Sequence, residues 1–263
     1  LNSGTDALTF GLSLAGVRKG DEVITPPNSF IGSSAAIAHL GAIPIFADVR
    51  SDQNINPEEI EKKITKKTKA IMPVHLSGLP CEMERIMKIS KKYNLPVIED
   101  AAQAIGTKYK NKFVGTFGEV GCFSAHPLKN LNAMGDAGYL VTNNRKIAEK
   151  VRLLRNHGIK KRDKVVAFGF VSRMDNIQAT VLNLRLKKLN NVISKRRANA
   201  KLYFKELSNL KNILLPIERK NYFHTYHTFV IQADRRNKLK KYLEKKGIST
   251  KIHYPYLIFE QEA

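Results

Sequence analysis

Short apolar runs alternate with amphipathic stretches through the first two-thirds of the chain. Runs of this length, bounded by turn residues, predict β-strands at 22–26, 42–49, 70–77, 96–101, 120–125 and 138–143. Helical patterns lie between them at 57–64 and 82–93, and the first has Asn56 as N-cap and Pro57 in its first turn. This alternation predicts an α/β domain with a mostly parallel sheet and helices on its faces. In such domains, ligands bind beyond the carboxyl ends of the strands.

The pattern changes near residue 173. Apolar residues recur there near helical spacing, at Ile177, Val181, Leu184 and Leu189. Three predicted elements follow: a basic helix at 194–207, an apolar strand at 227–232 and a helix at 234–247. These features are typical of a smaller α+β region joined through a long helix. We therefore divide the chain into a large domain, residues 1–190, and a small C-terminal domain, residues 191–263.

The chain carries a large positive charge of +22, from 45 basic and 23 acidic residues. A value of this size suggests a nucleic-acid surface, and a nucleic-acid-binding regulator is kept as the alternative function. The basic residues, however, are interleaved with glutamates and apolar core positions, without an aromatic-studded basic tract or zinc-finger spacing. We therefore favour a solvated lysine-rich surface, with no nucleic-acid partner. The positive charge also suits a phosphorylated or nucleotide-linked substrate.

Neither a membrane span nor a metal site is predicted. No run of about 18 apolar residues occurs, so no membrane partner is expected. The two cysteines, Cys81 and Cys122, lack metal-ligand spacing. We interpret them as reduced thiols of a cytoplasmic protein rather than as a disulfide framework.

Two segments could form an anion site and a buried acid. Residues 2–8, NSGTDAL, place Ser3, Gly4 and Thr5 before a helix, where free backbone N–H groups and the helix dipole favour an anion. An ordinary helix cap is the alternative interpretation. Asp100 stands at the carboxyl end of an apolar strand and needs a cationic partner such as a metal, an arginine or a protonated ring nitrogen, unless it caps a helix.

Lys129 lies in a small, polar, glycine-bounded segment, residues 122–138, just past a strand that ends near Ser124. One arrangement uses a phosphate cradle, a buried acid and an isolated lysine together. It is pyridoxal phosphate held as a Schiff base, with the acid on the pyridinium nitrogen. Spacing alone leaves a surface loop lysine as the alternative.

A series of ordered motifs extends through nearly the whole chain: NSGTDAL, GDEVITPPNSF, GAIPIFADV, TKAIMPVHLSG, VIEDAAQAIG, GCFSAHPLKNLNAMGDAG, SRMDNIQA and GISTKIHYP. With these motifs the sequence resembles the DegT/DnrJ/EryC1/StrS family of sugar aminotransferases. The resemblance implies the pyridoxal-phosphate transferase fold of type I, with a three-layer large domain and a smaller C-terminal α+β domain.

The resemblance also implies a role for particular residues. Lys129 matches the Schiff-base lysine and Asp100 the acid paired with the pyridine nitrogen. The other implied cofactor contacts are Gln103 near the phenolic oxygen, Gly4, Thr5 and Ser124 at the phosphate, and Phe30 stacked on the ring. Three residues match positions near the substrate, although a structural role is equally open for each histidine: His126, His253 and Tyr254.

Members of this family take an amino group, usually from L-glutamate, and transfer it to a nucleotide-linked keto-sugar. The resemblance therefore implies these two substrates, a homodimer, and a place in surface-glycan or secondary-metabolite synthesis. The segment KNLNAMGDAG, residues 129–138, is similar to members that act at carbon 3 of the sugar. Related dehydratases carry histidine in place of the lysine, so Lys129 argues against that activity.

The chain departs from the family pattern at several places. Val171 stands where many relatives have an asparagine that reaches the phosphate of the neighbouring subunit, and Ala125 stands where an aromatic residue is usual. We expect that the phosphate is held in another way or that the cofactor binds more weakly. The chain also starts without methionine and stops soon after HYP, so we expect it to be truncated at both ends, with an incomplete small domain.

Overall fold

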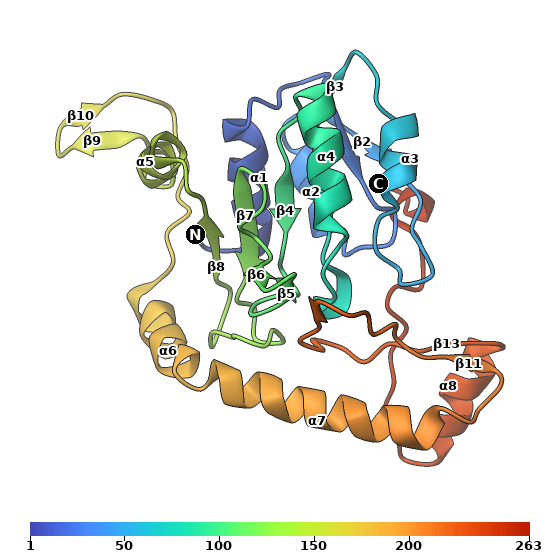
Figure 1. Cartoon of the computed structure of the whole chain (residues 1–263). Helices are drawn as coiled ribbons and strands as arrows, with labels where there is room; N and C mark the ends of the chain where they lie inside the picture. The colour runs from blue at the N-terminus through green and yellow to red at the C-terminus, as the bar shows by residue number, and fades with distance from the viewer.

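The computed structural model describes all residues 1–263, and a mixed sheet forms its centre (Figure 1). The pairings give the order β2-β1-β3-β4-β7-β8, in which bridges from Ile71 to Val97 and from Val74 to Asp100 join the two halves. The strands are β1 (Glu22–Thr25), β2 (Ile43–Phe46), β3 (Thr68–Ile71), β4 (Ile98–Asp100), β7 (Val120–Ser124) and β8 (Gly138–Val141). Only β8 is antiparallel to its neighbour, so the predicted mostly parallel sheet is confirmed.

Helices cover both faces of this sheet. One layer contains α1 (Gly4–Leu14), α2 (Gly32–Ala38) and α5 (Arg145–Leu154), and the other contains α3 (Pro57–Lys62) and α4 (Met83–Tyr93). Each face of the sheet has its own hydrophobic core. Successive residues of a strand contribute to opposite cores, because side chains alternate across a strand. Val23 packs in the α1 layer and Ile24 in the α4 layer. The result is a three-layer α/β domain.

Local signals fix several boundaries. Asn56 accepts a hydrogen bond from the N–H of Glu58 at 3.1 Å, as predicted for the N-cap of α3. The run predicted as a strand at 70–77 is shorter in the structure, because β3 ends at Ile71 and a 3₁₀ turn occupies Leu76–Gly78. Pro73 lies in this run and has no N–H for a ladder, although its carbonyl accepts from the N–H of Asp100 at 2.9 Å.

The last third of the chain runs along α6 (Asn176–Leu186) and the long α7 (Leu189–Leu207). The expected apolar positions of α6 are largely unburied, with Ile177 66% and Leu184 60% exposed. Smaller elements complete the fold: hairpins β5 (Lys108–Tyr109) with β6 (Lys112–Phe113) and β9 (Ile159–Lys161) with β10 (Lys164–Val165), strands β11 (Ile213–Leu214), β12 (Tyr222–Phe223) and β13 (Gln232–Ala233), α8 (Arg236–Lys245) and a 3₁₀ turn at Ile258–Glu260.

The strand predicted at 227–232 is wrong except at its last residue, where β13 begins. The chain instead passes the 3₁₀ turn, where the N–H of His227 donates to the carbonyl of Ser77 at 2.9 Å. The segment before it returns to the large domain, since β12 pairs with β5 and Thr225 is fully buried. The division at residue 190 stays a prediction. No helix has the length and apolar character needed to cross a bilayer, and both cysteines are buried and unpaired.

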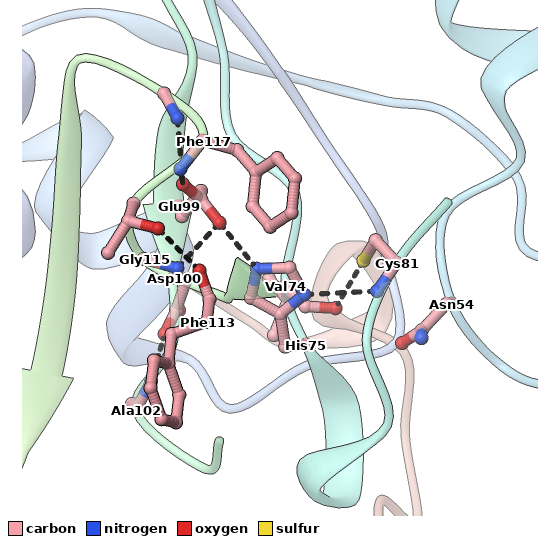
Figure 2. A network of polar contacts seen from close by, with 12 residues as sticks. Asn54, Val74, His75, Cys81, Glu99, Asp100, Ala102, Phe113, Gly115 and Phe117 are labelled. Carbon is pink, nitrogen blue, oxygen red and sulfur yellow. Dashed lines mark hydrogen bonds and ion pairs between the residues drawn. The ribbon is translucent and has the colours of Figure 1, made fainter. Parts of the chain in front are cut away.

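A buried carboxylate network fixes the end of β4 (Figure 2). Glu99 is 0% exposed and accepts from the N–H groups of Gly115, Phe117 and Gly118 at 2.7–2.8 Å. His75 Nε2 lies 3.1 Å from the same carboxylate. Burial raises the pKa of Glu99, but the hydrogen bonds from His75 and these backbone groups outweigh it and leave the pKa below its ordinary value.

The ring of His75 is fixed from both sides. The N–H of Cys81 donates to Nδ1 at 3.0 Å, so the ring proton is on Nε2 and points at Glu99. The backbone N–H of His75 donates to the carbonyl of Asp100 at 3.0 Å. One histidine therefore joins the chain after β3 to both acidic residues of β4.

Glu99→Gln is expected to destabilise the protein by about 2–4 kcal/mol, because an amide cannot accept from all four donors and leaves at least one unsatisfied in the core. Urea unfolding of both proteins measures this difference. Glu119→Gln, in the same part of the chain, is the matched control. The Glu119 side chain is exposed and makes no hydrogen bond, since only its backbone carbonyl accepts one. Equal stabilities for Glu99→Gln and the control would contradict the assignment.

Candidate active site

Strand ends and helix starts meet at the carboxyl edge of the sheet. Ser124 ends β7 and pairs with Gly138, while α1 begins beside them at Gly4. A Cβ atom at Gly4 would lie 2.8 Å from the Ser124 Cβ, and one at Gly138 would lie 2.2 Å from the backbone of Ser3. Glycine at both positions therefore allows the N-terminus of α1 to approach the end of β7.

The start of α1 has the properties of an anion cradle. Ser3 caps the helix through the N–H of Asp6 at 3.0 Å, but the N–H groups of Gly4 and Thr5 donate to no acceptor. Such free groups at a helix N-terminus bind phosphates. Ser124 lies against Gly4, and its hydroxyl accepts only from the N–H of His126 at 3.3 Å.

Asp100 ends β4 and is 4% exposed. Its Oδ2 accepts from the Ser33 hydroxyl at 2.7 Å and its Oδ1 from the N–H of Ala102 at 3.1 Å. Burial raises the pKa of Asp100, which these hydrogen bonds and the charge of Lys129 only partly offset. No lysine, arginine or histidine lies within ion-pair distance of it. A buried acid of this kind suits a cationic ring nitrogen supplied by a ligand.

Lys129 lies in the turn after β7, where its N–H donates to the carbonyl of His126 at 2.9 Å. Its amine is half-buried and makes neither an ion pair nor a hydrogen bond. Burial lowers the pKa of Lys129, and Asp100 acts in the opposite direction. A lysine whose pKa is lowered in this way is a better nucleophile and base near neutral pH.

A flat ring could lie beside Phe30, which is 57% exposed in the turn before α2. The Phe30 ring centroid lies 6.4 Å from that of Tyr254. The Tyr254 hydroxyl accepts from Gln103 Nε2 at 3.0 Å. The side-chain oxygen of Gln103, Oε1, accepts from the N–H of Ser77 at 2.7 Å. Burial raises the pKa of Tyr254 to about 12, so it stays a neutral phenol. These contacts bring the C-terminal segment to Phe30 and Gln103.

The two histidines that match positions near the substrate, His253 and His126, differ in burial. The pKa of His253 is lowered by burial and by the charge of Lys129, and its ring centroid lies 4.8 Å from that of Tyr254. His126 is exposed, and its Nδ1 accepts from the N–H of Leu128 at 3.2 Å. Its ring therefore stabilises the turn before Lys129, which is the structural role that the sequence left open.

Sequence reasoning missed Ser33, whose hydroxyl holds Asp100 and is itself 2.8 Å from the Ser29 hydroxyl. The signal was the small polar stretch around Phe30, at the carboxyl end of β1. It was hidden because serines near a helix start are more often simple caps.

The residues present fit pyridoxal phosphate. The free N–H groups at the start of α1 suit its phosphate, the exposed Phe30 face suits its ring, and Asp100 suits its pyridine nitrogen. Nearby, the Ser34 hydroxyl is buried without a hydrogen-bond partner, which leaves one more donor for a ligand. Val171 forms a bridge with Asn156 and is 57% exposed.

A model of the DegT/DnrJ/EryC1/StrS aminotransferase family matches residues 1–263, and the chain therefore belongs to this family. The resemblance inferred from the motifs is confirmed. The chain is 42% identical to the UDP-N-acetyl-3-dehydro-α-D-glucosamine 3-aminotransferase of Acidithiobacillus ferrooxidans, covering 96% of this chain and 69% of that protein. It is 41% identical, with the same two coverages, to a protein of Geobacillus stearothermophilus named pleiotropic regulatory protein.

The fold and the cofactor are supported by a solved relative. NtdA from Bacillus subtilis, with bound cofactor PMP, is 37% identical and has a TM-score of 0.92, covering 100% of this chain and 61% of that one. PMP is the aminated form of pyridoxal phosphate. The predictions of an aminotransferase with the α/β fold and of this cofactor are confirmed.

Asp100→Asn is expected to lower the pKa of the Lys129 amine further, because it removes the negative charge that favours the ammonium form. The pH dependence of Lys129 acetylation in cofactor-free protein, followed by peptide mass spectrometry, measures this pKa. The midpoint should move to lower pH. Asp136→Asn, an exposed acid in the same loop, should leave it unchanged. A midpoint that stays the same or rises in Asp100→Asn would contradict the electrostatic influence of Asp100 on Lys129.

Proposed function

We propose that this chain moves an amino group from L-glutamate to a nucleotide-linked keto-sugar, with pyridoxal phosphate bound through Lys129. The observation that carries the proposal is the half-buried Lys129 amine, which has no partner and whose pKa responds to the buried Asp100. The alternative is a nucleic-acid-binding regulator. It rests on the charge of +22 and on one relative's name, and neither accounts for this lysine.

Each residue of the site has a separate task in this proposal. Gly4, Thr5 and Ser124 bind the phosphate, and the exposed face of Phe30 stacks on the ring. When bound, the cofactor supplies an electron sink for bonds to the amino carbon. Asp100 supplies the negative charge opposite its pyridine nitrogen. The side chain of Gln103 donates to the Tyr254 hydroxyl and so fixes the C-terminal segment beside the ring.

Lys129 Nζ is the base that takes and returns a proton in both half-reactions. Its task needs an amine that is neutral part of the time, which the burial of Lys129 favours. The two half-reactions then differ only in their substrate, first the amino donor and then the keto-sugar. His253 and Tyr254 are proposed on the substrate side because Tyr254 accepts from Gln103 and the His253 ring lies 4.8 Å from the Tyr254 ring.

The acceptor is proposed from the relatives. The Acidithiobacillus ferrooxidans protein is named for a UDP-linked 3-dehydro sugar, which agrees with amination at carbon 3. The positive charge of this chain suits an acceptor with a diphosphate. A role in surface-glycan or secondary-metabolite synthesis is proposed from the family resemblance. A cytoplasmic location is proposed from the two unpaired cysteines.

Absorption spectra test this function directly. The protein loaded with pyridoxal phosphate should have a near-visible band that bleaches with L-glutamate and returns with a keto-sugar nucleotide. Lys129→Ala should abolish this bleaching and the turnover. Lys150→Ala, at an exposed position on α5, should keep both. A wild-type protein that takes up no cofactor and instead binds DNA with steep salt dependence would favour the regulator.

A homodimer is also proposed. Several large apolar residues between the β9–β10 hairpin and the end of α6 are 46–102% exposed: Val166, Phe168, Phe170, Ile177, Leu184 and Leu186. Monomers rarely expose so many apolar side chains within one segment, and such patches are typical of interfaces.

Light scattering should give the mass of two chains for the wild type. Phe168→Ser combined with Ile177→Ser should shift the protein toward monomer, because both side chains would lose apolar burial between subunits. Leu214→Ser on β11, at a leucine outside this segment that is about as exposed as Ile177, should leave the mass unchanged. A wild-type monomer would disprove the proposal.

A further inference from the structure

The backbone of His227 lies between the Ser77 turn and the segment that follows Lys129. Its N–H donates to the carbonyl of Ser77 at 2.9 Å, and the N–H of Ser77 donates to Gln103 at 2.7 Å. On the other side, Asn130, which follows Lys129, donates from Nδ2 to the carbonyl of Thr225 at 3.4 Å. The backbone that carries His227 is thus hydrogen-bonded toward both Gln103 and the lysine turn.

The ring of His227 makes no hydrogen bond, although its Nδ1 is buried. The two fully buried histidines of this chain, His75 and His224, behave in the ordinary way. Both nitrogens of His75 are bonded, and His224 Nδ1 accepts from the N–H of Tyr226 at 3.0 Å. Buried polar atoms are nearly always paired, so an unpaired one at a ligand site points to a partner from outside the chain.

The surroundings of His227 define what that partner can be. Burial lowers the pKa of His227 to about 3, and the charges of Lys129, Arg196 and His253 act in the same direction. Arg196 is itself held on the carbonyls of Tyr226 and His227, at 3.2 and 3.0 Å. The imidazole is therefore neutral at physiological pH, with one nitrogen that donates and one that accepts.

A hydroxyl can serve either tautomer of a neutral imidazole, because it both donates and accepts. A carboxylate can only accept, and so fits one tautomer alone. We infer that His227 Nδ1 hydrogen-bonds a ring hydroxyl of the keto-sugar acceptor and thereby positions this substrate at Lys129. The inference rests on the proposed function and assigns to it a residue that the sequence did not single out.

Two variants of the loaded protein separate this role from a structural one. His227→Leu removes the polar group, whereas His227→Asn can place an amide near the position of Nδ1. In His227→Leu, cofactor uptake and bleaching by L-glutamate should stay within about twofold of wild type, while the KM for the acceptor rises about tenfold or more. His227→Asn should recover most of this loss. The first acceptor probe is UDP-N-acetyl-3-dehydro-α-D-glucosamine, followed by other keto-sugar nucleotides until one restores the band in the wild type.

Each contrary result has a distinct meaning. An unchanged acceptor KM in His227→Leu would overturn the inference. Slowed bleaching by L-glutamate in His227→Leu, with the cofactor band intact, would also overturn it and place the donor's carboxylate at His227. A wild type that bleaches with L-glutamate but responds to no keto-sugar nucleotide would refute the proposed acceptor, and the inference would fail with it. Loss of the cofactor band in both variants would give His227 a structural role instead.

Discussion

The structure depends on a carboxylate that has no access to water. Both carboxylate oxygens of Glu99, in the middle layer, need hydrogen-bond donors from the protein. Three backbone N–H groups of the loop before β7 and His75 after β3 supply them. A charge buried without such partners would cost more than a typical domain can offset. The four donors therefore fix the relative position of three chain segments that are distant in sequence.

This constraint is transmitted directly to the site, because Asp100 is the next residue. Neighbouring side chains on a strand point to opposite faces, so Glu99 faces the loop before β7 while Asp100 faces Ser33 at the start of α2. The carbonyl of Asp100 is also bonded to the N–H of His75. The acid that would pair with a cofactor is thus held by side chain and backbone together, and its rigidity derives from the network behind it.

The sequence predicted the strands of the central sheet and the α3 cap, because these follow from short-range patterns. It failed where long-range contacts decide. Ile177 and Leu184 recur near helical spacing, as in an amphipathic helix, but the single chain leaves both side chains exposed. The strand expected at 227–232 is replaced by contacts with Ser77, about 150 residues earlier (227 − 77), which no local pattern could indicate. The place of His126 near the substrate stays a prediction, and its Nδ1 accepts from the N–H of Leu128 in its own turn.

The distribution of unpaired polar groups supports a ligand at this edge more strongly than any single contact does. Most buried polar groups in the chain are bonded, as in the Glu99 network. The exceptions include the N–H groups at the start of α1, the Lys129 amine and His227 Nδ1. Each would be costly to leave unpaired for packing alone. Their positions, at the start of α1, in the turn after β7 and beside the Ser77 turn, follow from the same sheet edge. A phosphate, a carbonyl carbon and a hydroxyl are the groups that would satisfy them in turn, which is the set that a cofactor and a sugar bring together.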